Sequence, residues 1–397
     1  MSKTNHKFLY KVPNNINDDD YYHNNNIVEC SANIFKKFIK YREIITIAEM
    51  QSGKTDVMKR LVYVINNYNK DLKNIGVDID KYNVYIIICA SSINLKTQHQ
   101  LKLSEIKHKI YHLNDINNMI RNQSEYESIL ITMADSSLII FDECHCDAEC
   151  EKLIDKFRKL IKKISKENKT KYYKVGFSAT AYEQILAGYP KVIMWPDSGY
   201  YGIRDMFKSI ENNKSNSLPV IFPAKNLSIN KECEDLFEEI NICKKYYIFR
   251  LPGKKNLDDI IIESVANQFK NRGSKIDTYI YDMSYKDSIN NLINEKPNKP
   301  TVIFIKDKLR LGEYLNTKYI YLVHDDPNNM YTHTTVQSLL GRCCGYGKKI
   351  HGTLIYCDHN KAYEHYVWII NNYDKKHIPS HAKYITKNNK IRQKCIY

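Results

Sequence analysis

The sequence predicts an α/β fold class with two domains in tandem, each built on a parallel β-sheet. Short apolar runs rich in β-branched residues alternate with polar or helix-like stretches, a pattern typical of βαβ units. The pattern pauses at the polar residues 208–217 and then restarts. The length of 397 residues also suits two domains better than one.

The strand candidates fall into two sets. The first set comprises residues 44–47, 84–89, 138–141, 173–177 and 192–195. The second set comprises residues 246–250, 278–281, 301–305, 319–323 and 353–356, and residues 257–269 have helical apolar spacing. The predicted organisation is a flexible arm at 1–26, a first domain at 27–207, a linker at 208–224, a second domain at 225–375 and a basic tail at 376–397.

Composition narrows the class of protein. The 60 Lys and Arg residues against 45 Asp and Glu give a formal charge of +15, which suits a polyanionic partner, although a Lys-rich coding bias would give the same excess. No apolar run approaches the ~18 residues of a membrane span, and no secretory signal opens the chain. We therefore expect no membrane association, and we interpret the 11 cysteines as free thiols in a reducing compartment.

A candidate phosphate-binding loop follows the first predicted strand and precedes a predicted helix. Gly53 permits close approach of the backbone, whose N–H groups point at phosphates together with the helix N-terminus. Lys54 offers a point charge to the β and γ phosphates, and the Thr55 hydroxyl is a hard ligand for Mg²⁺. The candidate binding residues are Ala48, Glu49, Met50, Gln51, Ser52, Gly53, Lys54 and Thr55.

A pair of acids ends the third predicted strand. Asp142 and Glu143 follow the apolar residues 138–141, which places them at the carboxyl edge of the predicted sheet, where ligands bind in open α/β folds. Asp142 can hold Mg²⁺ directly or through water, and Glu143 can orient an attacking water molecule. A zinc site at Cys144, His145, Cys146 and Cys150 is disfavoured because it overlaps these acids and lacks a second, distant ligand pair.

With His145 the acids form a D-E-C-H box, and the order of motifs resembles that of superfamily 2 helicases of the DEAD/DEAH-related type. Residues 177–181 (FSATA) resemble motif III, which implies that Ser178 and Thr180 couple nucleotide state to nucleic-acid binding. Residues 90–95 occupy the place of motif Ia, where Ser91 and Ser92 would contact the phosphodiester backbone. The resemblance implies two RecA-like domains with an ATP cleft between them.

Residues 337–346 of the second predicted domain resemble motif VI. Arg342 is the best candidate for an arginine that reaches the γ-phosphate, and Gln337 belongs to the same motif. Gln337 lies one residue farther upstream than in the family, and Gly345 replaces the second arginine. Arg310, in a segment that could stand in for motif V, is the second candidate for nucleotide contact. The adenine-recognition glutamine of strict DEAD-box proteins is not evident before Ala48.

The resemblance implies an ATP-dependent helicase that uses ATP and Mg²⁺ to unwind or remodel DNA or RNA. Two alternatives stay open: a translocase that moves on duplex without separating strands, and a non-hydrolysing scaffold that binds nucleic acid. We expect single- or double-stranded nucleic acid as partner, a monomeric chain and a protein that assists its loading. The coding bias suggests a phage or large DNA virus, and hence a cytoplasmic location in the host or at a site of viral replication.

Overall fold

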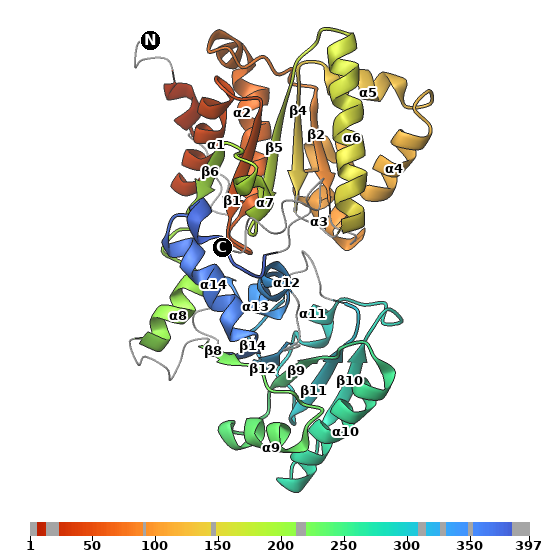
Figure 1. Ribbon diagram of the computed structural model, residues 1–397, viewed down its shortest axis with the longest axis vertical. Helices are drawn as coiled ribbons and strands as arrows, with labels where there is room; N and C mark the ends of the chain where they lie inside the picture. Colours follow the sequence, from red (N-terminus) through yellow and green to blue (C-terminus); the bar gives the residue numbers. More distant parts are fainter. Residues whose placement is uncertain are drawn as a thin grey trace. The chain divides into compact units, whose positions relative to one another are not determined.

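The computed structural model describes residues 6–12, 24–89, 93–143, 148–211, 220–308, 315–325, 331–347 and 352–382. The chain divides into two units, Met1–Asp197 and Ser198–Tyr397. Each unit contains a six-stranded sheet whose strand pairs are all parallel (Figure 1). The prediction of two tandem α/β domains with parallel sheets is therefore confirmed.

The sheet of the first unit has the strand order β3-β2-β4-β5-β1-β6. Its strands are β1 Glu43–Ala48, β2 Val84–Ile88, β3 Ile110–His112, β4 Ser137–Asp142, β5 Tyr172–Ser178 and β6 Lys191–Met194. Every residue of β2 and β4 is buried, as expected for parallel strands covered on both faces. All five strands predicted for this half are present, and β3 is the additional one.

Helices cover both faces of this sheet. Connections β1–β2 and β2–β3 run in one direction across the sheet and β3–β4 and β4–β5 in the other, so right-handed crossovers place their helices on opposite faces. One face carries α2 Lys54–Asn74 and α3 Ile93–Lys102, with α1 Asn25–Phe38 packed on α2. The other carries α4 Leu113–Arg121, α5 Glu127–Ala134 and α6 Ala148–Glu167, which pack together (Figure 1). None of the helices in the described ranges has the length and apolarity that crossing a bilayer requires.

The described part of the predicted N-terminal arm is packed on the first unit. Phe8 and Leu9 in the short 3-10 helix Lys7–Tyr10 are buried. The Arg60 guanidinium on α2 donates hydrogen bonds to the carbonyl oxygens of Leu9 and Lys11, at 3.2 and 2.6 Å. Two buried apolar residues and a buried arginine therefore hold residues 6–12 against α2, and only the rest of the arm stays a prediction.

The sheet of the second unit has the strand order β10-β11-β9-β12-β14-β8. The predicted strands appear as β9 Tyr246–Arg250, β10 Asp277–Tyr281, β11 Thr301–Ile305, β12 Ile320–His324 and β14 Leu354–Cys357. The sixth strand, β8 Val220–Pro223, lies inside the range predicted as linker. Its apolar run is short and ends in proline, which suits an edge strand but is easily mistaken for a loop.

The start of the second unit also differs from the predicted boundary. Helix α8 Ile203–Glu211, assigned from sequence to the first domain, packs on β8 and on α14 His359–Ile370 of the second unit. The short strand β7 Tyr200–Tyr201 pairs with β13 Gly345–Tyr346 of the same unit. Residues 198–211 therefore belong to the second unit by their contacts, because the apolar faces of these elements are buried there.

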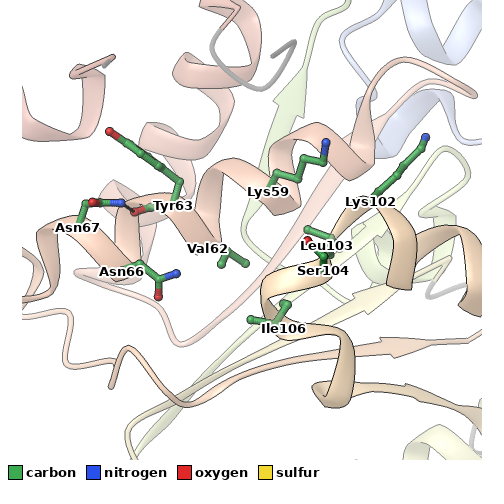
Figure 2. A pocket seen from close by; sticks show the side chains of 9 residues that line it. All are labelled: Lys59, Val62, Tyr63, Asn66, Asn67, Lys102, Leu103, Ser104 and Ile106. Carbon is green, nitrogen blue, oxygen red and sulfur yellow. Dashed lines mark hydrogen bonds between the residues drawn. The ribbon is translucent and has the colours of Figure 1, made fainter. Parts of the chain in front are cut away.

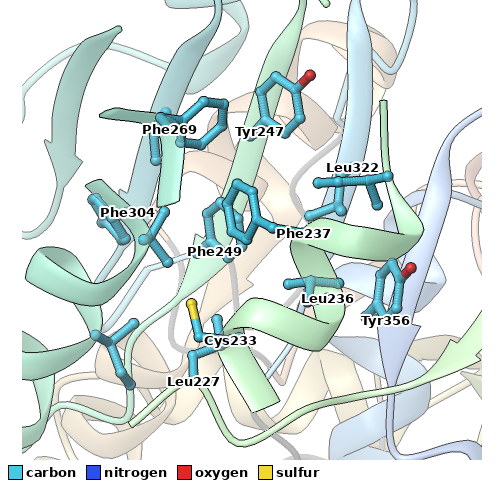
Figure 3. Packing of buried hydrophobic residues seen from close by; sticks show 14 of the residues in the cluster. Leu227, Cys233, Leu236, Phe237, Tyr247, Phe249, Phe269, Phe304, Leu322 and Tyr356 are labelled. Carbon is cyan, nitrogen blue, oxygen red and sulfur yellow. The ribbon is translucent and has the colours of Figure 1, made fainter. Parts of the chain in front are cut away.

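Aromatic side chains fill the core of the second unit on one face of its sheet (Figure 3). Helices α9 Asn230–Glu239 and α10 Lys255–Asn271 bring Phe237 and Phe269 together edge to face, with ring centroids 5.0 Å apart. Tyr247 of β9 meets Phe269 in the same way at 5.1 Å. Edge-to-face contacts of this kind add to the area that such rings bury, and they fix the helices on the strands that lead to the carboxyl edge.

Candidate functional site

The loop between β1 and α2 has the strand–loop–helix context that phosphate binding requires. Gln51 and Gly53 have φ angles of 56° and 102°, in the left-handed region. The Ser52 hydroxyl donates to the Glu49 carbonyl oxygen at 2.7 Å, which closes the turn. The φ of Gly53 would strain any other residue, and a Cβ there would also lie close to the Ile27 Cδ1 atom, at 3.3 Å, so the backbone conformation favours glycine here.

The side chain of Lys54 meets the acidic box. Its Nζ lies 2.5 Å from Glu143 Oε1, although the two residues are 89 positions apart in the chain. The side chains are 11% and 5% exposed, so the pair is largely removed from water. Strand β5 alone separates β1 from β4 in the sheet, and both strands end at the same edge. The structure therefore brings together the lysine and the glutamate that sequence motifs single out.

Asp142, the last residue of β4, is buried and bonded to a histidine. His99 Nε2 lies 3.0 Å from Asp142 Oδ2, and both side chains are almost fully enclosed. Burial by itself raises the pKa of the Asp142 carboxyl, but the hydrogen bond and charge of His99, with a smaller effect of Lys54, leave that pKa lowered. The carboxyl is thus held in its charged form, the form that binds a cation.

The donor set at this edge fits Mg²⁺. Within the described part of the chain, Asp142 Oδ1 is buried and has no hydrogen bond of ordinary geometry. A buried, charged oxygen without such a bond is a costly feature that a cation would relieve. The Thr55 hydroxyl, in the first turn of α2, is a second hard oxygen. The described residues contain no group of three or more His, Cys, Asp and Glu side chains that could hold a metal, and Cys144, His145 and Cys146 lie outside them.

The sequence analysis missed His99. It lies on α3, which begins inside the segment assigned to motif Ia, so it connects that helix to the end of β4. Nothing in the local sequence distinguishes it from a surface histidine, because α3 is mostly polar and weakly amphipathic. Ser91 and Ser92 themselves lie outside the described residues.

Ser178 and Thr180 lie at the end of β5, between the loop strand and the acidic strand. Ile47 is the register partner of Ser178, and Phe177 that of Asp142, so these residues share one edge of the sheet. The Thr180 N–H donates to Ser178 Oγ at 2.9 Å, and both side chains are buried. The predicted motif III residues are therefore close in the sheet to both halves of the candidate site, and their coupling role stays a prediction.

Gln337 and Arg342 lie in the second unit on two consecutive short helices. Gln337 ends α12 Thr332–Gln337, and Arg342 ends α13 Leu339–Arg342. Between them, Ser338 has φ −80° and ψ −140°, which interrupts the helix. The interruption therefore separates the short helix that ends in Gln337 from the one that ends in Arg342. The convergence of Arg342 with the nucleotide loop stays a prediction, and Arg310 lies outside the described residues.

A second ion pair organises the segment that carries Arg342. Arg250 Nε, at the end of β9, lies 2.7 Å from Asp325 Oδ1, just after β12. The other oxygen of Asp325 accepts the Leu339 N–H at 3.1 Å, which fixes the first turn of α13. Arg250 also donates to the Lys308 carbonyl oxygen at 2.9 Å. This network was not predicted from the sequence, although both charged residues stand at or just after the carboxyl ends of predicted strands.

Comparison with known proteins supplies a close viral relative. No family model matches the chain. Uncharacterized protein L594 of Acanthamoeba polyphaga mimivirus is 59% identical over 390 residues, which cover 98% of this chain and 99% of that protein. The expectation of a viral relative is confirmed by this match.

Solved structures similar to this chain carry helicase names. Helicase Lhr of Mycobacterium smegmatis, bound to ssDNA and AMP-PNP, is 12% identical with a TM-score of 0.44, over 88% of this chain and 50% of that one. The DEAH/RHA helicase HrpB of Escherichia coli is 12% identical with a TM-score of 0.46, over 83% and 42%. The DUF1998 helicase MrfA, bound to DNA and AMPPNP, is 13% identical with a TM-score of 0.48, over 97% and 56%. This chain spans about half the length of these helicases.

Proposed function

This chain belongs to the same protein family as uncharacterized protein L594 of Acanthamoeba polyphaga mimivirus, and we propose that it is an ATP-dependent nucleic-acid helicase of superfamily 2. The observation that carries the proposal is the contact between Lys54 of the candidate phosphate loop and Glu143 of the acidic box. The fold itself does not require Lys54, which follows Gly53 in its left-handed conformation, to contact Glu143, which follows the buried Asp142. Their meeting at the carboxyl edge of a parallel sheet is what an ATP-hydrolysing site requires.

Binding of ATP would rearrange the pair. The N–H groups of the loop and the first turn of α2 face the phosphates. The Lys54 ammonium group leaves the Glu143 carboxylate and binds the β and γ phosphates. Glu143, released from the lysine, then orients a water molecule for in-line attack and accepts its proton. Thr55 and Asp142 would hold Mg²⁺, which neutralises phosphate charge when bound. Without nucleotide, the ion pair keeps Glu143 from acting as a base.

The remaining predicted residues complete the proposal. Arg342 stabilises negative charge on the transferring phosphoryl group, with Gln337 beside it in the same motif and Arg310 as the second candidate. Ser178 and Thr180 transmit nucleotide state to the bound strand, to which Ser91 and Ser92 contribute backbone contacts. The strand itself is held through its phosphates by a chain of formal charge +15.

ATP hydrolysis measured with and without single-stranded DNA, single-stranded RNA and duplex, at fixed ionic strength, tests the proposal. We expect hydrolysis that rises with at least one of these polymers and that disappears in Lys54→Ala. Displacement of a fluorescent strand from a duplex then distinguishes a helicase from a duplex translocase. Nucleic-acid binding with no hydrolysis under any of these conditions contradicts the helicase and favours the scaffold.

A further inference from the structure

A cavity of about 350 Å³ lies on the face of the first sheet that carries α2 and α3. It is bounded by α2 on one side and, on the other, by the end of α3 with the 3-10 helix Ser104–Lys109. Val62, Leu103 and Ile106 supply its apolar lining, and they are 3%, 5% and 8% exposed. A volume of this order falls within the range of small-molecule sites.

One end of the cavity is cationic. Lys59 of α2 and Lys102 of α3 both line it, and Figure 2 shows their ammonium groups at the same end. Both lysines act on the carboxyl of Asp56, in the first turn of α2: burial raises the pKa of Asp56, and the two lysine charges oppose that rise. These three groups, two ammonium groups and one carboxylate, together carry a net positive charge. This end of the cavity therefore favours an anion.

The opposite end offers amides and an aromatic ring. Asn66, Asn67 and Tyr63 lie there in Figure 2, with the apolar floor between them and the lysines. The Asn67 amide donates to the Tyr63 carbonyl oxygen at 2.8 Å, which orients that side chain. The Arg60 guanidinium lies 4.9 Å from the centre of the Tyr63 ring and steadies it by a cation–π contact. These contacts constrain Asn67 and Tyr63, while the Asn66 and Asn67 side chains are exposed to solvent.

We propose that this cavity binds a nucleoside monophosphate group, with its phosphate at Lys59 and Lys102 and its base over the apolar floor. The amides of Asn66 and Asn67 would then pair with the polar edge of the base. A planar ring joined to an anion is the ligand that matches a cationic end, an apolar middle and an amide end in this order. None of the residues 48–55 lines this cavity, and AMP binding in it does not require ATP hydrolysis.

The test measures binding of AMP to the full-length chain by calorimetry in the absence of Mg²⁺. AMP lacks the β and γ phosphates that Lys54 is proposed to hold, so it is a poor ligand for the loop. We expect one AMP per chain, with the same affinity in Lys54→Ala. Loss of AMP binding in Lys54→Ala, or no saturable binding to the unaltered chain at millimolar AMP, overturns the proposal.

Two variants locate the bound AMP. Lys102→Glu reverses a charge at the phosphate end, and we expect it to weaken binding at least tenfold. Ser104→Trp places a large side chain in the cavity lining, and we expect it to abolish binding with an unchanged thermal midpoint. The matched control is Lys166→Glu, the same charge change at an exposed position of α6 on the other face of the sheet. Equal binding by Lys102→Glu and Lys166→Glu contradicts the assignment.

Competition identifies the source of the group. A 5′-phosphorylated tetranucleotide that displaces AMP, when its 5′-hydroxyl form does not, shows that the cavity takes the end of a nucleic-acid strand. Failure of both oligonucleotides to displace AMP shows that it takes the free nucleotide. AMP binding in the cavity without any ATP hydrolysis would support the nucleotide site and contradict the proposed helicase function. ATP hydrolysis without AMP binding would do the reverse, so the two failures are distinguishable.

Discussion

Separating Lys54 from Glu143 should reveal how strongly the two charges depend on each other. Breaking a fully buried ion pair by removing one partner costs about 3–5 kcal/mol, because the other charge stays uncompensated. The exposed fractions of 11% and 5% allow some hydration and lower that figure. We expect Lys54→Met and Glu143→Gln each to lower the free energy of unfolding by about 2–3 kcal/mol.

The double variant carries the test. With both charges removed, no buried charge is left without a partner, and we expect Lys54→Met/Glu143→Gln to lose only about 2 kcal/mol. The sum of the single effects is about 4–6 kcal/mol, so the coupling free energy is about 2–4 kcal/mol, at or above the upper part of the range seen for residues in contact.

Tryptophan fluorescence during urea unfolding measures these values in the first unit. The chain has two tryptophans, Trp195 at the end of the first unit and Trp368 in the second. In a Trp368→Phe background, Trp195 alone reports on the first unit within the full-length chain. Single effects that add to the double effect within about 0.5 kcal/mol would refute the pairing of Lys54 with Glu143.

Three further outcomes follow from other contacts. His99→Ala should raise the Mg²⁺ concentration for half-maximal hydrolysis about tenfold, as loss of a residue that orients a metal ligand does, and an unchanged Mg²⁺ requirement would contradict its positioning role. Asp325→Asn should lower kcat for ATP hydrolysis about tenfold at unchanged nucleotide affinity, because the amide has one acceptor oxygen where the carboxylate serves both Arg250 and the Leu339 N–H, and stopped-flow nucleotide binding beside steady-state kinetics checks this split. Burial lowers the pKa of His324 from 6.5 to about 4. As the pH falls, His324 is therefore protonated in the unfolded chain before it is protonated in the folded chain. This difference lowers the free energy of unfolding by about 3 kcal/mol between pH 6.5 and pH 4, and His324→Gln should remove that contribution in denaturation curves measured over this pH range.

The strands that form the centre of each sheet could be predicted because burial on both faces leaves long apolar runs in the sequence. Two of the four edge strands, β3 and β8, were missed for the opposite reason, whereas the edge strands β6 and β10 were predicted. β3 Ile110–His112 is only three residues long, and β8 Val220–Pro223 ends in proline inside a polar stretch. Neither strand has an apolar run of the length on which the prediction depends. Because β8 was not recognised, its residues were included in the predicted linker 208–224.

The candidate site could be predicted only in part. Lys54 and Glu143 could be expected to meet because both follow strands of one parallel sheet, whose carboxyl ends share an edge. The contact of His99 with Asp142 could not, because it depends on how α3 packs and not on any pattern in the chain. The break at Ser338 is also a packing result, since no residue there is a helix breaker of the glycine or proline type.

Hydrolysis of ATP by Glu143→Gln distinguishes a catalytic role of Glu143 from a purely structural one. The amide keeps the size of the side chain but cannot accept a proton from water, so we expect the rate to fall at least about 100-fold while the affinity for ATP is retained. The lost ion pair to Lys54 lowers the thermal midpoint of this variant, so both chains are assayed well below that midpoint, where retained nucleotide affinity excludes unfolding as the cause. Hydrolysis by Glu143→Gln at the rate of the unaltered chain would contradict the claim that the edge formed by β1, β4 and β5 is an ATP-hydrolysing site.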